Sequence, residues 1–360
     1  MLGKRIIGLD AAKTIAMFCV VLLHYAFYSQ VYANCIPENL VAAFTSVGVP
    51  LFFLVNGYLL FSKKYDYETH RNKILKIITI LLVWKLITLP IASVLSGFAI
   101  SKNKWVSYML GASYDSIGYF WFMNALIAVY LVFPVLKLSF DDQRIGRVRL
   151  RNLCILLALF VFGVNTINDV YGIFAHVFGI SAVTPFNSLL QFNIFGEYSY
   201  VLVYFIVGGL LPDIMLLLRD GLKHRYTICV SSIAIVSFIL LVILQRYQAV
   251  TENKAFIVDN GYSNLLVLLL AVSILILLLG INATDCKLNE IVSIFGANTL
   301  GVYYLHYIII VVFQKIIGNY INGTLPLVVN IACAFSLYCI CLIATIIMKK
   351  IPIIGEMFKG

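Results

Sequence analysis

Apolar residues gather along this chain in repeated runs, most of them close to the length of about 20 residues that an α-helix needs to cross a bilayer. The runs are continuous rather than alternating, so they predict helices and not the short alternating strands of a membrane barrel. We expect about ten spans by this rule. They lie at residues 7–30, 40–61, 74–98, 119–138, 152–172, 195–217, 227–245, 262–281, 291–314 and 324–348.

The fifth run is the least distinct of these. Its apolar sequence stops at Gly163–Val164, where the polar sequence NTIND follows. We expect the segment from Tyr171 to Glu197 to form an outer loop.

Composition agrees with this pattern, since 62% of the residues are hydrophobic and 12% are charged. A soluble protein of this size does not need so much apolar surface. No linker, low-complexity segment or convincing internal repeat interrupts the chain. The fold predicted for residues 1–360 is therefore a single all-α domain, a polytopic integral membrane protein. The first run is expected to be retained as a span, because Asp10 and Lys13 interrupt it and no small-residue cleavage site follows.

Lysine and arginine are concentrated in alternate loops, which predicts that both termini are cytoplasmic. The predicted cytoplasmic segments hold Lys4, Arg5, Lys63, Lys64, Arg71, Lys73, Lys76, Arg144, Arg147, Arg149, Arg151, Arg219, Lys223, Arg225, Lys287, Lys349, Lys350 and Lys359. The other loops hold Lys102, Lys104, Arg246, Lys254 and Lys315. The net charge of +10 is explained by these loops, so we expect no nucleic-acid partner. The eight cysteines are scattered without a CxxC pair, so we expect neither disulfides nor a metal site.

Charged and polar residues within the first span need an explanation. A charged side chain at the centre of a membrane helix costs about 2.5–3.5 kcal/mol on translocon scales. Lys13 and His24 are eleven residues apart, so they share one helix face about 16 Å apart along the axis. Asp10 lies one turn before Lys13. The alternative is that His24 packs against another helix and Lys13 reaches the headgroups.

A second histidine occurs in the ninth span, within FGANTLGVYYLH. Counted from the start of each span, His306 lies about 22 Å deep and His24 about 25 Å deep, so the two are predicted to share a polar cavity. His306 could instead be a packing residue, or lie in an aromatic belt beside Tyr303. Lys85 is deep in the third span and needs a partner or an aqueous cavity.

Taken together, these segments resemble the acyltransferase-3 family of bacterial integral-membrane O-acyltransferases, in their standalone membrane form. The resemblance runs through the whole chain and rests on GLDAAKTIAMFCVVLLH, GVPLFFLVNGYLL, HRNKILKI, FWFMNALIAVYLVFPVL, YVLVYFIVGGLL and LGVYYLH, in the family's order. Two positions differ from the family's commoner pattern, since Lys13 replaces an arginine and Asn56 replaces a serine.

The resemblance implies transfer of an acyl group, expected to be acetyl, from acetyl-CoA to a hydroxyl of a surface polysaccharide or lipid-linked sugar, in the bacterial cytoplasmic membrane. Acetyl-CoA is then a co-substrate, and no bound cofactor is implied. Lys13 would hold the CoA phosphates together with Arg71, Lys73 and Lys76. Because lysine meets phosphate as a point charge and not bidentately, the change at position 13 bears on how the donor is held.

The same resemblance suggests catalytic roles. His24 is expected to be the general base, since histidine titrates near the working pH. His306 would orient the acceptor or accept the acyl group transiently. Tyr303 and Asn56 are candidate hydrogen-bond donors to the developing oxyanion. Trp121 is a candidate substrate contact, although an interface anchor is the commoner role of such a residue.

Two other classes of protein remain to be weighed. A proton-coupled exporter or flippase of a glycan or lipid-linked sugar would also use histidine and lysine within its spans. The absence of internal repeats and the polar track along the first span favour the enzyme. A purely structural subunit fits poorly with several ionisable residues inside the membrane.

Overall fold

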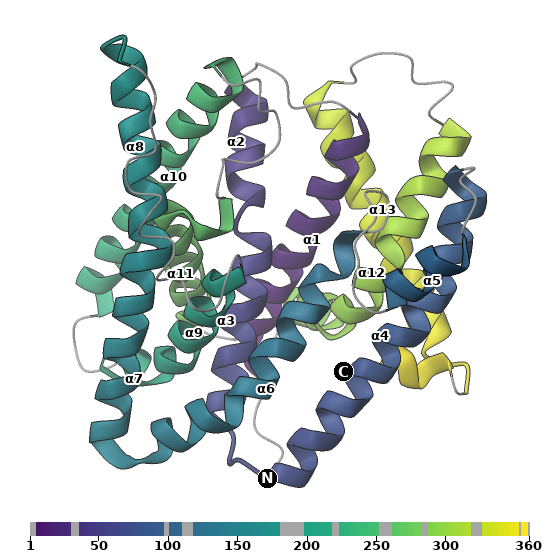
Figure 1. Ribbon diagram of the computed structural model, residues 1–360, viewed down its shortest axis with the longest axis horizontal. Coiled ribbons are helices and arrows are strands. Elements are labelled where there is room, and N and C mark those ends of the chain that lie inside the picture. Colours follow the sequence, from purple (N-terminus) through teal and green to yellow (C-terminus); the bar gives the residue numbers. More distant parts are fainter. Residues whose placement is uncertain are drawn as a thin grey trace. The chain divides into compact units, whose positions relative to one another are not determined.

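The computed structural model describes residues 5–29, 36–96, 101–109, 118–180, 198–217, 223–251, 261–281, 287–317, 326–352 and 354–358, and these residues form helices and no β-strand (Figure 1). The predicted all-α class is thereby confirmed. The α-helices are α1 (Ile7–Ser29), α2 (Ile36–Thr45), α3 (Gly48–Phe61), α4 (Tyr67–Ser96), α5 (Lys102–Met109), α6 (Trp121–Asp141), α7 (Gln143–Ala158), α8 (Val164–Val177), α9 (Ser199–Leu217), α10 (Lys223–Thr251), α11 (Leu265–Leu279), α12 (Lys287–Ile317) and α13 (Leu327–Met348). The shorter helical segments are η1 (Gly118–Phe120), η2 (Leu159–Gly163), η5 (Gly261–Ser263) and η6 (Ile354–Phe358).

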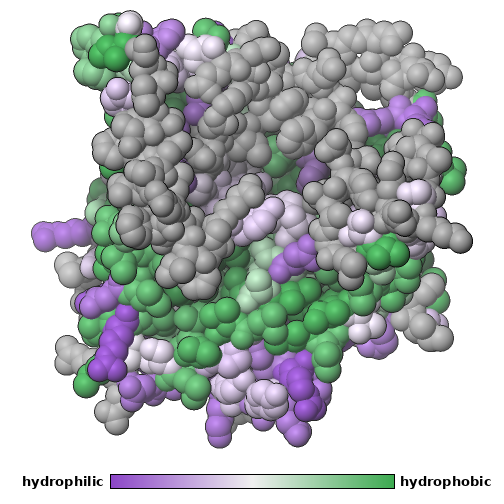
Figure 2. All heavy atoms as spheres, viewed as in Figure 1, coloured by the Kyte–Doolittle hydropathy of each residue, from purple (hydrophilic) through white to green (hydrophobic). Residues whose placement is uncertain are grey.

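Eight helical segments in the described part of the chain are long and apolar enough to cross a bilayer. Two more apolar helices, at Ser199–Met215 and Leu265–Leu279, are shorter. Each of the ten predicted spans coincides with one of these segments, while the count of ten and the cytoplasmic termini stay predictions. Large apolar side chains are exposed on the helices, as lipid contact requires, and hydrophobic residues are prominent on the part of this face that is not grey (Figure 2).

Two of the predicted spans differ in detail from the observed helices. The span at 40–61 is interrupted by a turn at Ser46–Val47, after which α3 begins with Pro50 in its first turn, where proline is tolerated. The fifth span is longer than the predicted 152–172. Helix continues from Gln143 to Val177 through the π-helical segment η2, so Tyr171 does not begin a loop. The rest of the predicted loop, at 181–197, lies outside the described residues.

The chain forms two compact units, and each is discontinuous in sequence. Unit 1 comprises Met1–Lys63 and Leu136–Gly296, and unit 2 comprises Lys64–Val135 and Ala297–Gly360. The helices α6 and α12 contribute residues to both. The single domain expected for 1–360 stays a prediction.

Glycines allow the closest helix packing in unit 1. A Cβ atom on Gly57 of α3 would meet the backbone carbonyl of Phe205 on α9, and one on Gly208 of α9 would meet the carbonyl of Leu54. A Cβ atom on Gly8 of α1 would likewise meet the carbonyl of Leu278 on α11. Small residues let helix backbones approach in this way. The contact of Gly8 with Leu278 holds α1 against the end of α11.

Candidate functional site

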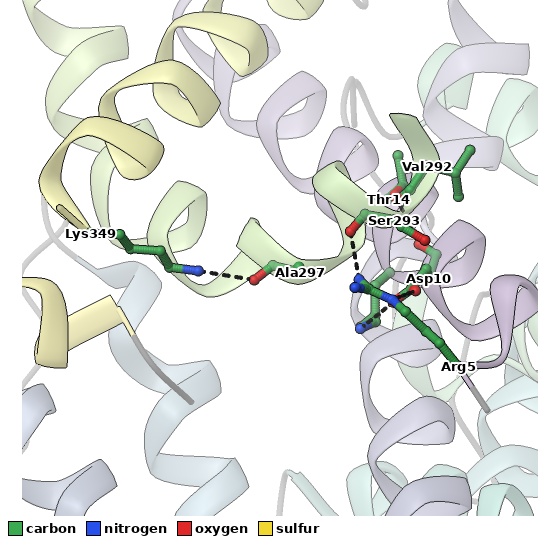
Figure 3. A network of polar contacts seen from close by, with 8 residues as sticks. Arg5, Asp10, Thr14, Val292, Ser293, Ala297 and Lys349 are labelled. Atoms are coloured by element: carbon green, nitrogen blue, oxygen red, sulfur yellow. Dashed lines mark hydrogen bonds and ion pairs between the residues drawn. The ribbon is translucent and has the colours of Figure 1, made fainter. Parts of the chain in front are cut away.

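A buried carboxylate organises the N-terminal end of α1 (Figure 3). The side chain of Asp10 is only 4% exposed and forms ion pairs with both Arg5 and Lys13, the latter with Nζ 2.7 Å from Oδ1. Arg5 also donates from Nη2 to the carbonyl of Ser293 on α12, at 2.6 Å. A Cβ atom on Gly296 would meet the Asp10 side chain, so α12 approaches α1 closely here. The buried Asp10 is therefore compensated by two cations.

This cluster, Arg5, Asp10 and Lys13, carries two positive charges and one negative charge. A net positive charge remains after the internal pairing. The Lys13 side chain is 23% exposed, whereas that of Asp10 is 4% exposed. An ammonium has three N–H donors, and one of them faces Asp10. The ion pair with Asp10 thus engages one of the three donors of Lys13.

His24 lies further along the same unbroken helix and is partly buried. Its neighbour Tyr25 is buried, and the leucines that precede it are buried as well. The third site residue that the sequence places in unit 1, Asn56 on α3, donates from Nδ2 to the carbonyl of Phe52 at 2.8 Å. This bond to the preceding turn directs the amide along its own helix.

In unit 2, His306 on α12 is fully buried, and its Nδ1 lies 2.6 Å from the carbonyl oxygen of Tyr303. A carbonyl oxygen can only accept a hydrogen bond, so Nδ1 carries the proton. In the neutral ring the lone pair is then on Nε2. The ring also meets Tyr119 edge-on, with centroids 5.3 Å apart at 74°. The structure thus holds His306 in the tautomer that a base acting through Nε2 requires.

Two further predicted site residues lie in unit 2. The Tyr303 hydroxyl donates to the carbonyl of Tyr119 at 2.7 Å, so its proton is engaged with the backbone. Trp121 is the first residue of α6 and is partly buried, with its ring 6.4 Å from that of Phe122. Tyr303 therefore ties α12 to η1, next to the start of α6.

The buried charge of Lys85 is compensated by groups on a neighbouring helix. This residue of α4 is 3% exposed, and its Nζ donates to the carbonyl of Tyr108 on α5 at 3.1 Å. The same ammonium lies 5.4 Å from the centre of the Tyr108 ring, a cation–π geometry. A backbone carbonyl and an aromatic face thus act as the partner that the sequence required.

The basic residues predicted to bind phosphate lie in the first turns of α4. Arg71 is exposed with its guanidinium 5.9 Å from the Tyr67 ring, Lys73 lies 5.3 Å from the Tyr130 ring, and Lys76 is exposed. Cations at this end of a helix are not favoured by the helix dipole, whereas anions are. The arrangement is electrostatically suited to an anionic ligand.

Asp66 caps this helix. Its Oδ2 accepts from the backbone N–H of Thr69 at 2.9 Å. Hydrogen bonds from the Thr69 hydroxyl and backbone N–H lower the pKa of Asp66 below its ordinary value. Asp66 is therefore ionised at neutral pH, and it fixes the start of α4, from which Arg71 and the lysines project.

His70 is a residue that the sequence analysis did not single out. It is buried, and its Nε2 lies 2.8 Å from the carbonyl of Tyr130 on α6, with Phe133 and Tyr65 around the ring. Because a carbonyl accepts, Nε2 carries the proton. His70 thus joins α4 to α6, and only its position next to Arg71 in the basic stretch could have drawn attention to it.

The predicted site residues divide between the two units. Unit 1 contains Lys13, His24 and Asn56, and unit 2 contains Arg71, Lys73, Lys76, Trp121, Tyr303 and His306. The single phosphate site and the cavity shared by the two histidines thus stay predictions. Among the described residues no group of histidine, cysteine and acidic side chains could hold a metal ion, and the described cysteines are free thiols.

Comparison with known proteins identifies the class. The family model described as an acyltransferase domain matches residues 6–346, nearly the whole chain. The protein therefore belongs to the acyltransferase-3 family and is a membrane acyltransferase. No curated protein and no solved structure matches it.

Proposed function

We propose that the protein transfers an acetyl group from acetyl-CoA to a hydroxyl of a surface polysaccharide or lipid-linked sugar, in the bacterial cytoplasmic membrane. The observation that carries this proposal is the arrangement of α1. The ion-pair cluster around Lys13 and the imidazole of His24 lie on one unbroken helix, about 16 Å apart along its axis. An extended pantetheine arm can cover such a distance between the phosphates and the thioester.

The donor is held at its phosphates. Lys13 contacts a phosphate while Arg5 and Asp10 keep its ammonium in place. Arg71, Lys73 and Lys76 supply further positive charge from the start of α4. Lysine acts here as a point charge, so charge and position matter at residue 13 more than fork geometry.

The chemistry uses His24 as general base. Its imidazole accepts the proton of the sugar hydroxyl as the oxygen attacks the thioester carbonyl. The tetrahedral intermediate then collapses, the C–S bond breaks, and the thiolate of CoA takes the proton back from the imidazolium. The products are the acetyl ester of the sugar and free CoA. Asn56 is a candidate donor to the oxyanion.

His306 has the second role. With Nδ1 directed at the Tyr303 carbonyl, its Nε2 lone pair orients the acceptor hydroxyl or accepts the acyl group transiently. Tyr303 positions the ring, and its hydroxyl can reach an oxyanion only when its bond to Tyr119 opens. Trp121, at the start of α6, is proposed to contact the substrate.

The test is release of CoA by the purified protein, reconstituted in lipid with acetyl-CoA and a membrane glycolipid extract. Wild type should release CoA in an extract-dependent manner. His24→Ala and His24→Gln should lose a factor of about 10²–10⁴, because Gln retains hydrogen bonding but cannot accept the proton. Substantial activity in the Gln variant would make His24 a packing residue. Movement of glycolipid across the bilayer without CoA release would instead identify a transporter.

A further inference from the structure

Two fully buried amide side chains in unit 1 have no role in the proposed chemistry. Asn39 on α2 and Gln245 on α10 are both 0% exposed. Neither the amide nitrogen nor the oxygen of either side chain has a hydrogen-bond partner among the described residues. Burying unpaired amides is unfavourable, so four unpaired atoms in a helix bundle require an explanation.

Helix register places Asn39 at the same depth as His24. Cys19 on α1 lies against the carbonyl of Phe44 on α2, with Sγ 4.0 Å from the oxygen, and Gly48, the first residue of α3, lies against Cys19 and Ala16. The chain from Phe44 to Gly48 therefore runs antiparallel to α1. Five residues outward from the Cys19–Phe44 contact, His24 and Asn39 each lie about 7.5 Å further along their helices.

Gln245 lies at a similar depth to Asn39 and His24. The helices α2 and α10 pack together, and α2 lies between α10 and α1 (Figure 1). The rings of Phe44 and Phe238 meet edge-on, with centroids 6.4 Å apart. Gln245 lies about 10.5 Å beyond Phe238. In the alternating topology that the loop charges predict, this is the direction in which His24 lies.

Hydroxyl and aromatic groups of unit 1 also lie on α9 and in η5. Ser199, at the start of α9, is 2% exposed, and its hydroxyl has no hydrogen-bond partner among the described residues. The Tyr204 hydroxyl donates to the carbonyl of Tyr262 at 2.8 Å, and the rings of Tyr200 and Tyr262 are 5.9 Å apart.

This end of unit 1 is also braced by polar contacts that leave Asn39 and Gln245 out. Asn165 on α8 donates to the Ser263 hydroxyl at 3.0 Å, and Asn264 donates to Asp169 at 2.8 Å. Asn165 and Asn264 thus have partners on neighbouring elements, which Asn39 and Gln245 lack among the described residues.

We infer that Asn39 and Gln245 form a subsite that binds hydroxyl groups of a neutral sugar ring, at the depth of His24. An amide offers both a donor and an acceptor, which matches a sugar hydroxyl, whereas a phosphate or carboxylate would need cationic partners. The subsite rests on the proposed function in one respect: it presents the bound hydroxyl to His24. Ser199 is its expected third contact.

The test compares leucine variants with wild type in thermal unfolding of the purified protein in detergent. The probes are glucose, rhamnose and N-acetylglucosamine as neutral sugars, with glucuronate and glucose 1-phosphate as charged ones. Neutral sugars should raise the Tm of wild type and charged sugars should not. Asn39→Leu and Gln245→Leu should raise the Tm without sugar, by about 2–4 °C each, because they remove buried unpaired atoms, and both should abolish the response to sugar.

Gln248→Leu is the matched control, since Gln248 lies three residues further along α10, is also buried, and has polar partners. It should lower the Tm and keep the response to sugar. The inference is overturned if the Asn39 and Gln245 variants lower the Tm, if their response persists, or if no neutral sugar stabilises wild type. The proposed acetyl transfer is tested separately, because its failure would appear as absence of CoA release from wild type. The subsite is then still tested by the effect of neutral sugars on the Tm of the folded protein.

Discussion

The ammonium of Lys13 lies 2.7 Å from Oδ1 of Asp10, one turn earlier on the same helix, and the same carboxylate pairs with Arg5. This relationship explains how α1 carries charge into an apolar helix. It also allows two roles for Lys13. The ion pair can be purely structural, or it can hold the ammonium in position to bind a phosphate. The net positive charge of the cluster favours the second.

Substitutions at Lys13 distinguish these two roles. A charge-assisted hydrogen bond contributes about 1.5–3 kcal/mol, so Lys13→Ala should weaken CoA binding by on the order of tenfold to a hundredfold. Lys13→Arg should keep or improve affinity, and Lys13→Glu should be worse than Ala. Calorimetry in detergent measures each affinity. Lys64→Ala, an exposed lysine before α4, is the control and should bind normally.

Unchanged CoA affinity in the Ala and Glu variants would remove the phosphate role. The structural alternative makes its own prediction, since exchanging the partners as Asp10→Lys with Lys13→Asp should then restore activity. We expect the exchanged protein to stay inactive, because the cation would be moved from its position.

Close helix packing predicts unequal costs for two glycine substitutions. Gly57→Ala places a methyl group against the Phe205 backbone, and such overpacking costs about 1–3 kcal/mol. Gly172→Ala on α8 meets nothing within 4 Å, so it should stabilise, by up to about 1 kcal/mol, through helix propensity. Denaturation in mild detergent compares them. Equal effects of the two variants would contradict the packing of α3 on α9.

The role of Nε2 in His306 is tested by a variant that keeps a donor at the Nδ1 position. His306→Asn keeps a donor near the Nδ1 position, facing the Tyr303 carbonyl, but removes the Nε2 lone pair. Transfer should fall while the folded protein persists, because the side chain can then neither orient the acceptor through Nε2 nor accept the acyl group. His70→Gln is the control, since it keeps a donor toward Tyr130 and should remain near wild-type activity. An active His306→Asn enzyme would reduce His306 to a packing residue.

The predicted orientation can be measured with single cysteines in a background without native ones. A membrane-impermeant thiol reagent should label positions within 32–39 from outside the cell and should not label positions within 63–76. The reverse labelling pattern would show that the topology is inverted, and the inferred sugar subsite would then face the cytoplasm.

The helical segments were largely predictable from sequence because bilayer thickness imposes their length. All ten apolar runs coincide with helices, but their ends do not. The run at 40–61 is broken at Ser46–Val47, and polar residues extend the fifth helix to Val177 because helical hydrogen bonding does not require an apolar sequence.

The residues around the candidate site were harder to predict. Motif resemblance and polarity marked Lys13, His24 and His306. Partnerships across helices are invisible to periodicity, which is why the Tyr108 carbonyl that receives Lys85 and the burial of His70 emerged only from the structure. Asn39 and Gln245 look like ordinary polar residues near helix ends, and only their burial without partners sets them apart.

The central claim, acetylation of a sugar hydroxyl, is tested most directly by mass spectrometry of surface glycans and lipid-linked sugars. Three otherwise identical strains should be compared: one with the wild-type protein, one without it, and one with His24→Ala. The account predicts an acetyl ester on a sugar in the wild-type strain alone, with the unmodified glycan still present in the other two. Identical acetylation in all three strains, or loss of the whole glycan from the surface without any change in acetylation, would contradict it.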